Sequence, residues 1–150
     1  MTWLLPPHLF LLCAAAMAAL HLFWPVARII PEPVWPAGLA VAVAGLVLTV
    51  VPARLFRRRS VNIRTFDAPT GLVTDGFFAI SRNPMYLGFL LVLAGLWIGL
   101  GTLSPLLPVL VFLMAAEHWY IPFEEKRMAE QFGEDYRVYR GRVRRWLGRK

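Results

Sequence analysis

Four long apolar stretches alternate with polar segments along the chain. They cover residues 9–30, 34–56, 85–101 and 103–120. A helix that crosses a membrane needs about 20 mostly apolar residues, so the pattern predicts four transmembrane helices, of which the third is somewhat short. The predicted fold class is therefore all-α, a polytopic membrane protein forming a single domain over residues 1–150. The polar residues 57–84 and 121–150 are predicted to form a loop and a C-terminal region outside the membrane.

Prolines and a candidate cap residue mark where the third and fourth helices begin. Pro84 suits the first turn of a helix, and Asn83 suits the N-cap position before it. The third helix is therefore expected to start at "SRNP", next to the long loop. Pro105 and Pro108 fall in or near the first turn of the fourth helix, where proline is tolerated. The last two stretches are expected to form a tight helical hairpin.

Small residues recur at helical spacing in the second and third stretches. Gly38, Ala42 and Gly45 lie on one side of the second stretch, and Gly95 and Gly99 form a pair in the third. Such spacing lets helix backbones approach closely in lipid, so these helices are expected to pack against each other.

The composition is that of a membrane protein rather than a soluble domain. The chain is 58% hydrophobic and 17% charged, whereas a soluble domain has about 45–50% apolar and about 25% charged residues. The net charge is +7, and every lysine and arginine except Arg28 lies within residues 54–82 or 126–150. With four spans these two segments share one side of the membrane.

Basic residues concentrate on the cytoplasmic side of membrane proteins. The two basic segments and both termini are therefore predicted to be cytoplasmic, and no nucleic acid is needed to explain the charge. Arg57, Arg58 and Arg59 are expected mainly to set the topology and to face lipid phosphates. Neither a disulfide nor a metal site is expected, because Cys13 is the one cysteine and no Cys/His cluster has ligand spacing.

The two cytoplasmic segments carry patterns of ordered structure. The loop contains apolar residues and turn signals at "APTG" and "TDG", so it is expected to pack against the membrane domain. In the C-terminal region Gly133 is expected to break a helix. Tyr136, Tyr139, Val143 and Trp146 then follow helical spacing, which predicts an amphipathic helix lying on an anionic leaflet.

Three glutamates lie close to the end of the fourth apolar stretch. Glu117 and Glu124 are seven residues apart and share a face if the helix continues through Pro122; Glu125 follows. Carboxylates near hydrocarbon are costly and often functional. The alternative is that they pair with Arg82 or Lys126, and the residues alone leave both interpretations open.

The stretch "SRNPMYLG" combines a helix start with a cation. A helix N-terminus presents free N–H groups and the positive end of the helix dipole, which suit an anion, and Arg82 adds a full charge. The alternative is an ordinary capped helix whose Arg82 reaches lipid phosphate.

The motifs "LVTDGFFAISRNPMYLG" and "FEEKRMAEQFGEDYRVYRGRVRRW", separated by the apolar hairpin, resemble the isoprenylcysteine carboxyl methyltransferase and phospholipid N-methyltransferase superfamily. The resemblance covers residues 72–146. It implies S-adenosylmethionine as methyl donor, a lipid-like or other hydrophobic acceptor from the membrane, and a cofactor site formed by the cytoplasmic loop and C-terminal helices.

The same resemblance implies which residues hold the donor. Its carboxylate suits the helix start, its ammonium suits Glu124, and its adenine suits an apolar wall, while Gly88 would let the cofactor or a neighbouring helix approach. The cofactor-binding residues expected on this basis are Leu72, Val73, Phe78, Arg82, Asn83, Pro84, Tyr86, Gly88, Glu124 and Glu125.

The candidates for catalysis are Glu117, His118 and Tyr120. Tyr120 stands where the carboxyl methyltransferases have an arginine for the substrate carboxylate, which disfavours a prenylcysteine acceptor. An amine or thiol acceptor must lose a proton, for which His118 or Glu117 is the candidate base. Two other functions stay open at this level, a membrane NADPH-dependent reductase and a non-enzymatic membrane scaffold.

Overall fold

The computed structural model describes residues 4–60 and 69–149, and these form helices and no strand. The elements in chain order are α1 (Pro6–Phe23), α2 (Trp35–Arg58), the 3-10 helix η1 (Gly76–Ala79), α3 (Pro84–Leu100), α4 (Leu106–Ala115), the π-helical turn η2 (Ala116–Tyr120) and α5 (Ile121–Arg142). The predicted all-α, polytopic fold is confirmed.

Three helices are long and apolar enough to cross a membrane. They are α1, α2 and the continuous helix Leu106–Arg142, which consists of α4, η2 and α5, while α3 is a shorter apolar helix. The first span ends at Phe23 and not at residue 30, because Pro25 cannot continue the helix. The fourth begins at Leu106, since residues 101–105 are used in the turn after α3.

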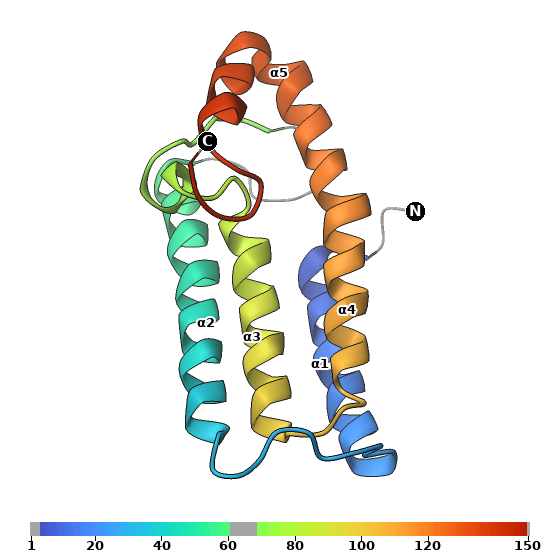
Figure 1. Ribbon diagram of the computed structural model, residues 1–150. Helices are drawn as coiled ribbons and strands as arrows, with labels where there is room; N and C mark the ends of the chain where they lie inside the picture. The colour runs from blue at the N-terminus through green and yellow to red at the C-terminus, as the bar shows by residue number, and fades with distance from the viewer. Residues whose placement is uncertain (1–3, 61–68, 150) are drawn as a thin grey trace.

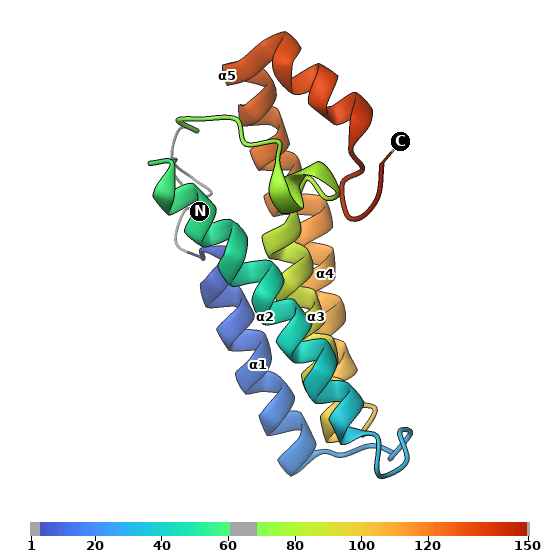
Figure 2. The ribbon, with the colours of Figure 1, turned by 90° about the vertical axis from the view of Figure 1, so that its left-hand side faces the viewer.

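The helices α1 to α4 lie side by side, with α2 against α3 and α1 beside α4 (Figures 1 and 2). At the upper end of Figure 1, the segment before α3 covers the ends of α2 and α3, and α5 rises above the bundle and turns back. The chain starts α1 and ends after α5 at this same end, as four spans require.

Glycines bring α2 and α3 into backbone contact. A Cβ atom at Gly45 would lie 2.6 Å from the carbonyl oxygen of Gly88, and one at Gly38 would lie 2.6 Å from that of Gly95. The expected packing of the two helices is confirmed for Gly38, Ala42, Gly45 and Gly95. The Gly99 backbone also lies at this contact, because a Cβ at Gly38 would lie 2.8 Å from the Gly99 amide nitrogen, although a Cβ at Gly99 itself would meet nothing within 4 Å. Gly88 is a further contact glycine that the pattern did not indicate.

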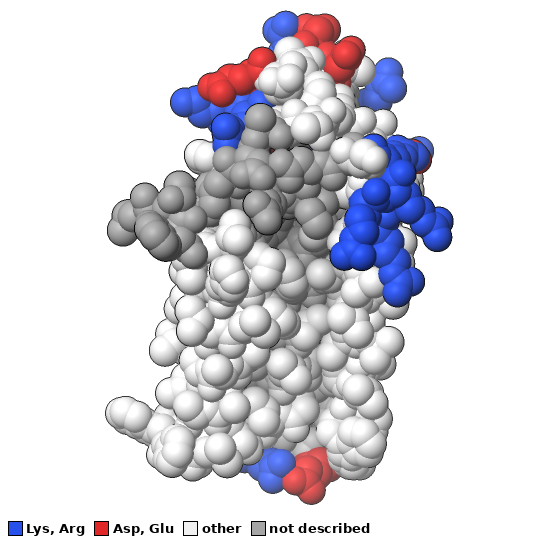
Figure 3. Space-filling view, turned by 180° about the vertical axis from the view of Figure 1, so that it is seen from behind, with Lys and Arg blue, Asp and Glu red and all other residues white. Residues whose placement is uncertain are grey.

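Charged side chains gather at the two ends of the molecule, with an uncharged band between them (Figure 3). The lower end carries the exposed ion pair of Arg28 and Glu32, 2.7 Å apart. At the upper end Arg59 makes a two-point contact with Asp75, with N–O distances of 2.7 and 2.5 Å. Arg59 therefore fastens the loop to the end of α2, which corrects the expectation that it mainly faces lipid phosphate.

The second half of α5 packs on the loop and not on the leaflet. Gly133 has φ +49°, a conformation open to glycine, and the helix bends there as expected. Beyond the bend, Tyr136, Tyr139 and Val143 are buried against Val73 and Phe78. The prediction that this face lies on an anionic leaflet is wrong, because the loop before α3 supplies the apolar surface that covers it.

Candidate active site

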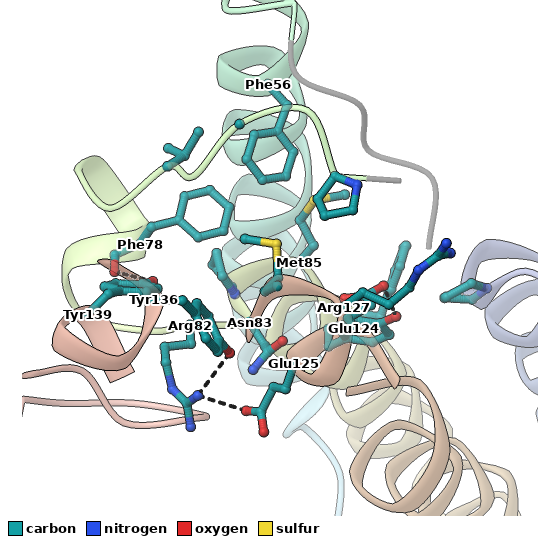
Figure 4. Close-up of a pocket in the computed structure, with 18 of the residues that line it drawn as sticks. Phe56, Phe78, Arg82, Asn83, Met85, Glu124, Glu125, Arg127, Tyr136 and Tyr139 are labelled. Carbon is teal, nitrogen blue, oxygen red and sulfur yellow. Dashed lines mark hydrogen bonds and ion pairs between the residues drawn. The ribbon is translucent and has the colours of Figure 1, made fainter. Parts of the chain in front are cut away.

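A pocket lies at the upper end of the bundle, where α3 begins (Figure 4). Its walls come from the end of α2, the segment before α3, the first turns of α3 and the two halves of α5. Among the predicted cofactor-binding residues, those that line it are Val73, Phe78, Arg82, Asn83, Pro84, Tyr86, Glu124 and Glu125.

The two other predicted cofactor residues lie outside the pocket. Leu72 packs against the cluster formed by Val73, Phe78 and the α5 tyrosines. Gly88 faces α2, where an added Cβ would lie 2.6 Å from the Gly45 carbonyl oxygen. Of the two uses considered for Gly88, the structure shows the close approach of a neighbouring helix.

One wall of the pocket presents a carboxylate. The Tyr86 hydroxyl donates to Glu124 Oε1 over 2.8 Å, which orients that side chain from the first turn of α3. Tyr86 is itself buried, and its ring stacks on Tyr120 with centroids 6.2 Å apart. Because packing fixes the position of the Tyr86 ring, the hydrogen bond from its hydroxyl orients the Glu124 carboxylate. The negative charge of this carboxylate suits an ammonium group.

Arg82 contributes a buried cation. Its side chain is 6% exposed, and its Nη1 donates to Glu125 at 2.9 Å and to the Tyr136 hydroxyl at 3.2 Å (Figure 4). Its Nε is buried and has no hydrogen-bond partner within the described residues. Buried polar groups are nearly always paired, so an unsatisfied donor beside a pocket points to an acceptor on a bound molecule.

The opposite wall is aromatic. Phe56 and Phe78 stack with ring centroids 4.9 Å apart. The Tyr139 hydroxyl donates to the Phe78 carbonyl oxygen over 2.7 Å, which fixes α5 to the loop. Burial raises the pKa of Tyr136 and of Tyr139 above the usual range of a phenol, so both hydroxyls remain neutral beside Arg82.

A C-terminal strap, residues 143–149, lies against the start of α3 and the segment before it. The Arg82 amide donates to the Arg144 carbonyl oxygen over 3.1 Å, and the Gly148 amide donates to that of Ile80 over 2.7 Å. Asn83 occupies the N-cap position as predicted, but its side chain makes no cap bond. Its Nδ2 donates instead to the Arg145 carbonyl oxygen at 3.1 Å.

The glutamates are divided between the pocket and the strap. Arg145 Nη2 and Nε donate to the two Glu125 oxygens at 2.8 and 3.2 Å, and Arg145 Nη1 donates to Glu117. Trp146 Nε1 donates to the other Glu117 oxygen at 2.7 Å. The interpretation of Glu117 and Glu125 as ion-pair partners is therefore confirmed, although Arg145 is a partner that the sequence did not indicate.

The π-helical turn explains why Glu117 shares a partner with Glu125 and not with Glu124. Proline has no N–H, and its ring clashes with the carbonyl four residues earlier. The wider turn at Ala116–Tyr120 lets the helix pass Pro122 without a break. It adds one residue to two turns, so residues eight apart face the same way. The expectation that Glu117 and Glu124 share a face is wrong for this reason.

None of the three catalytic candidates lines the pocket. His118 is exposed on the π-helical turn. Tyr120 is fully buried, and its hydroxyl donates to the Leu4 carbonyl oxygen over 2.7 Å. Glu117 is paired as described above, so each of these roles stays a prediction that the geometry of the pocket does not favour.

Several lining residues were missed from the sequence. Arg127 lies one helical turn after Glu124, so the spacing within "FEEKR" could have placed both on one face. Phe56, Met85, Phe89 and Met128 also line the pocket. Their apolar side chains gave no signal, because the same pattern predicts a buried or lipid-facing position.

Comparison with known proteins decides the family. The model of the family described as phospholipid methyltransferase matches residues 35–135. The chain belongs to the phospholipid methyltransferase family. The match includes the glycine contacts of α2 with α3, the start of α3 and Glu124, and it confirms the resemblance inferred from the motifs.

Relatives add little beyond the family. An uncharacterized protein of Haemophilus influenzae is 38% identical over 63 residues, which are 42% of this chain and the whole of that protein. No solved structure matches the chain. Membership of the family and the apolar helices make this a multi-pass membrane protein of a methyltransferase family.

Proposed function

We propose that the protein transfers a methyl group from S-adenosylmethionine to a lipid-like acceptor at the cytoplasmic face of its membrane. The observation that carries this is the pocket itself. It joins a charged wall of Arg82 and Glu124 to an aromatic wall, and it lies at the end of the helix bundle where α3 begins and α2 ends. The family supports methyl transfer as the reaction class.

The residues of the pocket fit the groups of the donor. Glu124 suits its ammonium, and the unsatisfied Nε of Arg82, with the first-turn amides of α3, suits its carboxylate. Val73 and Phe78 suit its adenine. When bound, the donor supplies an electrophilic methyl group on a sulfonium, whose leaving thioether is neutral.

The contribution of the protein is to position the donor and the acceptor and to exclude water from the pocket. Holding two reactants in line contributes about 7–11 kcal/mol in well-oriented intramolecular reactions. Pro6 and Pro7 at the start of α1 and Phe56 at the end of α2 add apolar lining to the pocket from two of the membrane helices. An acceptor with a hydrocarbon chain can reach the pocket there from the membrane.

The acceptor decides whether a base is needed. A carboxylate needs none, whereas an amine must first lose a proton. Glu117 is tied to Arg145 and Trp146, so His118 is the better candidate if an amine or thiol is methylated. No cation stands at position 120 to select a carboxylate, which supports an acceptor other than prenylcysteine.

Calorimetry on the detergent-purified chain tests the proposal. We expect saturable binding of S-adenosylmethionine at one site per chain and no binding of NADPH. Binding of NADPH in its place would favour the membrane reductase. Binding of neither would leave the scaffold, in which the carboxylates only pair with arginines.

A further inference from the structure

Arg145 joins three parts of the molecule that are far apart in sequence. Its carbonyl oxygen accepts from Asn83 at the start of α3, and its guanidinium binds Glu117 in the π-helical turn and Glu125 in α5. Its side chain does not line the pocket. Within residues 4–60 and 69–149, Asn83 and Glu125 are the pocket-lining residues to which its hydrogen bonds run.

Glu125 accepts hydrogen bonds from both Arg82 and Arg145. Arg145 binds it through two N–H groups, and Arg82 binds it through one at 2.9 Å. The Glu125 side chain is 11% exposed and that of Arg82 is 6% exposed. Charged hydrogen bonds of this two-point kind are strong and geometrically specific, so the position of Glu125, and through it that of Arg82, depends on Arg145.

The charges of this cluster balance. Arg82 and Arg145 carry two positive charges, and Glu117 and Glu125 carry two negative ones. The hydrogen bonds that Arg145 donates to Glu125 first, and to Glu117, raise the pKa of Arg145 above its usual range. Arg145 therefore keeps its charge at physiological pH. Removing it leaves Glu117 with no cation as partner among the described residues, and leaves Glu125 with Arg82 alone.

We infer that Arg145 is a positioning residue for the methyl donor. It holds Glu125 so that Arg82 presents its unsatisfied Nε to the pocket, and it holds Asn83 at the start of α3. This inference rests on the proposed function. It gives the strap and the π-helical turn a role in donor affinity, without contact between Arg145 and the donor.

The test is the binding of S-adenosylmethionine by Arg145→Gln, measured by calorimetry, which reports affinity and the number of sites separately. A positioning role raises Kd several-fold and leaves the number of sites at the value of the unchanged chain. A merely structural role lowers the number of competent sites and leaves Kd unchanged, which would overturn the inference. Arg142→Gln is the matched control, because it removes the same charge from an exposed residue next to the strap.

Two further variants test whether Arg145 affects donor affinity through Glu125. Arg145→Lys keeps the charge but loses the two-point geometry, so we expect a Kd between those of the unchanged chain and Arg145→Gln. The double variant Arg145→Gln with Glu125→Gln should bind the donor no more weakly than the single variant with the higher Kd. The reason is that each substitution alone already removes the contact between Arg145 and Glu125. Additive losses would contradict action through Glu125. Absence of donor binding by the unchanged chain would overturn the proposed function and this inference together.

Discussion

Adjacent glutamates at the start of α5 have different surroundings. Glu124 lines the pocket and accepts a hydrogen bond from Tyr86, while Glu125 is bound by Arg82 and Arg145. In an α-helix neighbouring residues point about 100° apart, so one carboxylate serves the pocket and the other the strap. Glu124 is the carboxylate to which we assign the donor ammonium.

Replacing Glu124 with glutamine keeps the size of the side chain and removes its charge. A charged hydrogen bond contributes about 1.5–3 kcal/mol, so the affinity for S-adenosylmethionine should fall at least several-fold in calorimetry. Glu130→Gln is the control, because Glu130 is an exposed residue of the same helix. Its ion pair with Lys126 is long, with 3.9 Å between Nζ and Oε1. An unchanged Kd in Glu124→Gln would remove Glu124 from the site.

His118 is the residue whose role depends on the acceptor. It is exposed and lies outside the pocket, so His118→Ala should bind S-adenosylmethionine with unchanged affinity. Turnover should fall only where the acceptor is an amine or a thiol, measured as the rate at saturating donor. A higher Kd for the donor in this variant would show that His118 belongs to the donor site.

At the scale of elements, the contact of α2 with α3 sets where the pocket lies. Gly38 and Gly45 meet Gly95 and Gly88 along the two helices, where a Cβ on any of the four would lie 2.4–2.6 Å from a backbone oxygen of the other helix. The end of α2, with Phe56, lines the same pocket as the start of α3, and Phe56 stacks there on Phe78. The aromatic wall of the pocket therefore depends on close helix packing within the membrane.

Alanine substitutions separate this packing from helix propensity. In an open helical position alanine is about 0.5–1 kcal/mol better than glycine. Gly45→Ala would place its Cβ 2.6 Å from the Val92 amide nitrogen, and overpacking costs about 1–3 kcal/mol. Gly45→Ala should lower the thermal unfolding temperature in detergent, whereas Gly99→Ala, with open space around its Cβ, should keep or raise it. Equal behaviour of the two variants would contradict the packing.

The elements predicted best from sequence are those set by local chemistry. Proline and the apolar run place the start of α3 at Pro84, and the positive φ that glycine tolerates places the bend at Gly133. The strap was missed, because contacts such as that of Asn83 with Arg145 join residues far apart in the chain and leave no periodic pattern. The π-helical turn was missed because a sequence shows Pro122 but not how the helix passes it.

At the scale of the whole molecule, charge and hydropathy give the protein two unlike ends. The upper end carries the basic segments, and the lower end carries the Arg28–Glu32 pair (Figure 3). The pocket lies at the basic end of the molecule. The side of the membrane on which this end lies therefore decides from which compartment the methyl donor can bind. Positive charge favours the cytoplasmic side.

Single cysteines at the two ends test this orientation. Arg142→Cys at the upper end should react with a membrane-impermeant maleimide in inside-out vesicles, and Glu32→Cys at the lower end should react in right-side-out ones. Cys13 is 4% exposed, so the unchanged chain gives the background. The reversed labelling pattern would place the pocket on the outer side and contradict the proposed topology.

The most direct test of the central claim follows the methyl group itself. Membranes containing the chain are incubated with S-adenosylmethionine labelled in its methyl carbon, with a metal chelator present, and the label extracted into organic solvent is measured. We predict transfer of label into the lipid fraction that the chelator does not reduce, because a neutral thioether leaves without a metal. The Glu124→Gln variant should transfer less at limiting donor. Label found only in water-soluble products, or lipid labelling that stops with the chelator, would contradict the account.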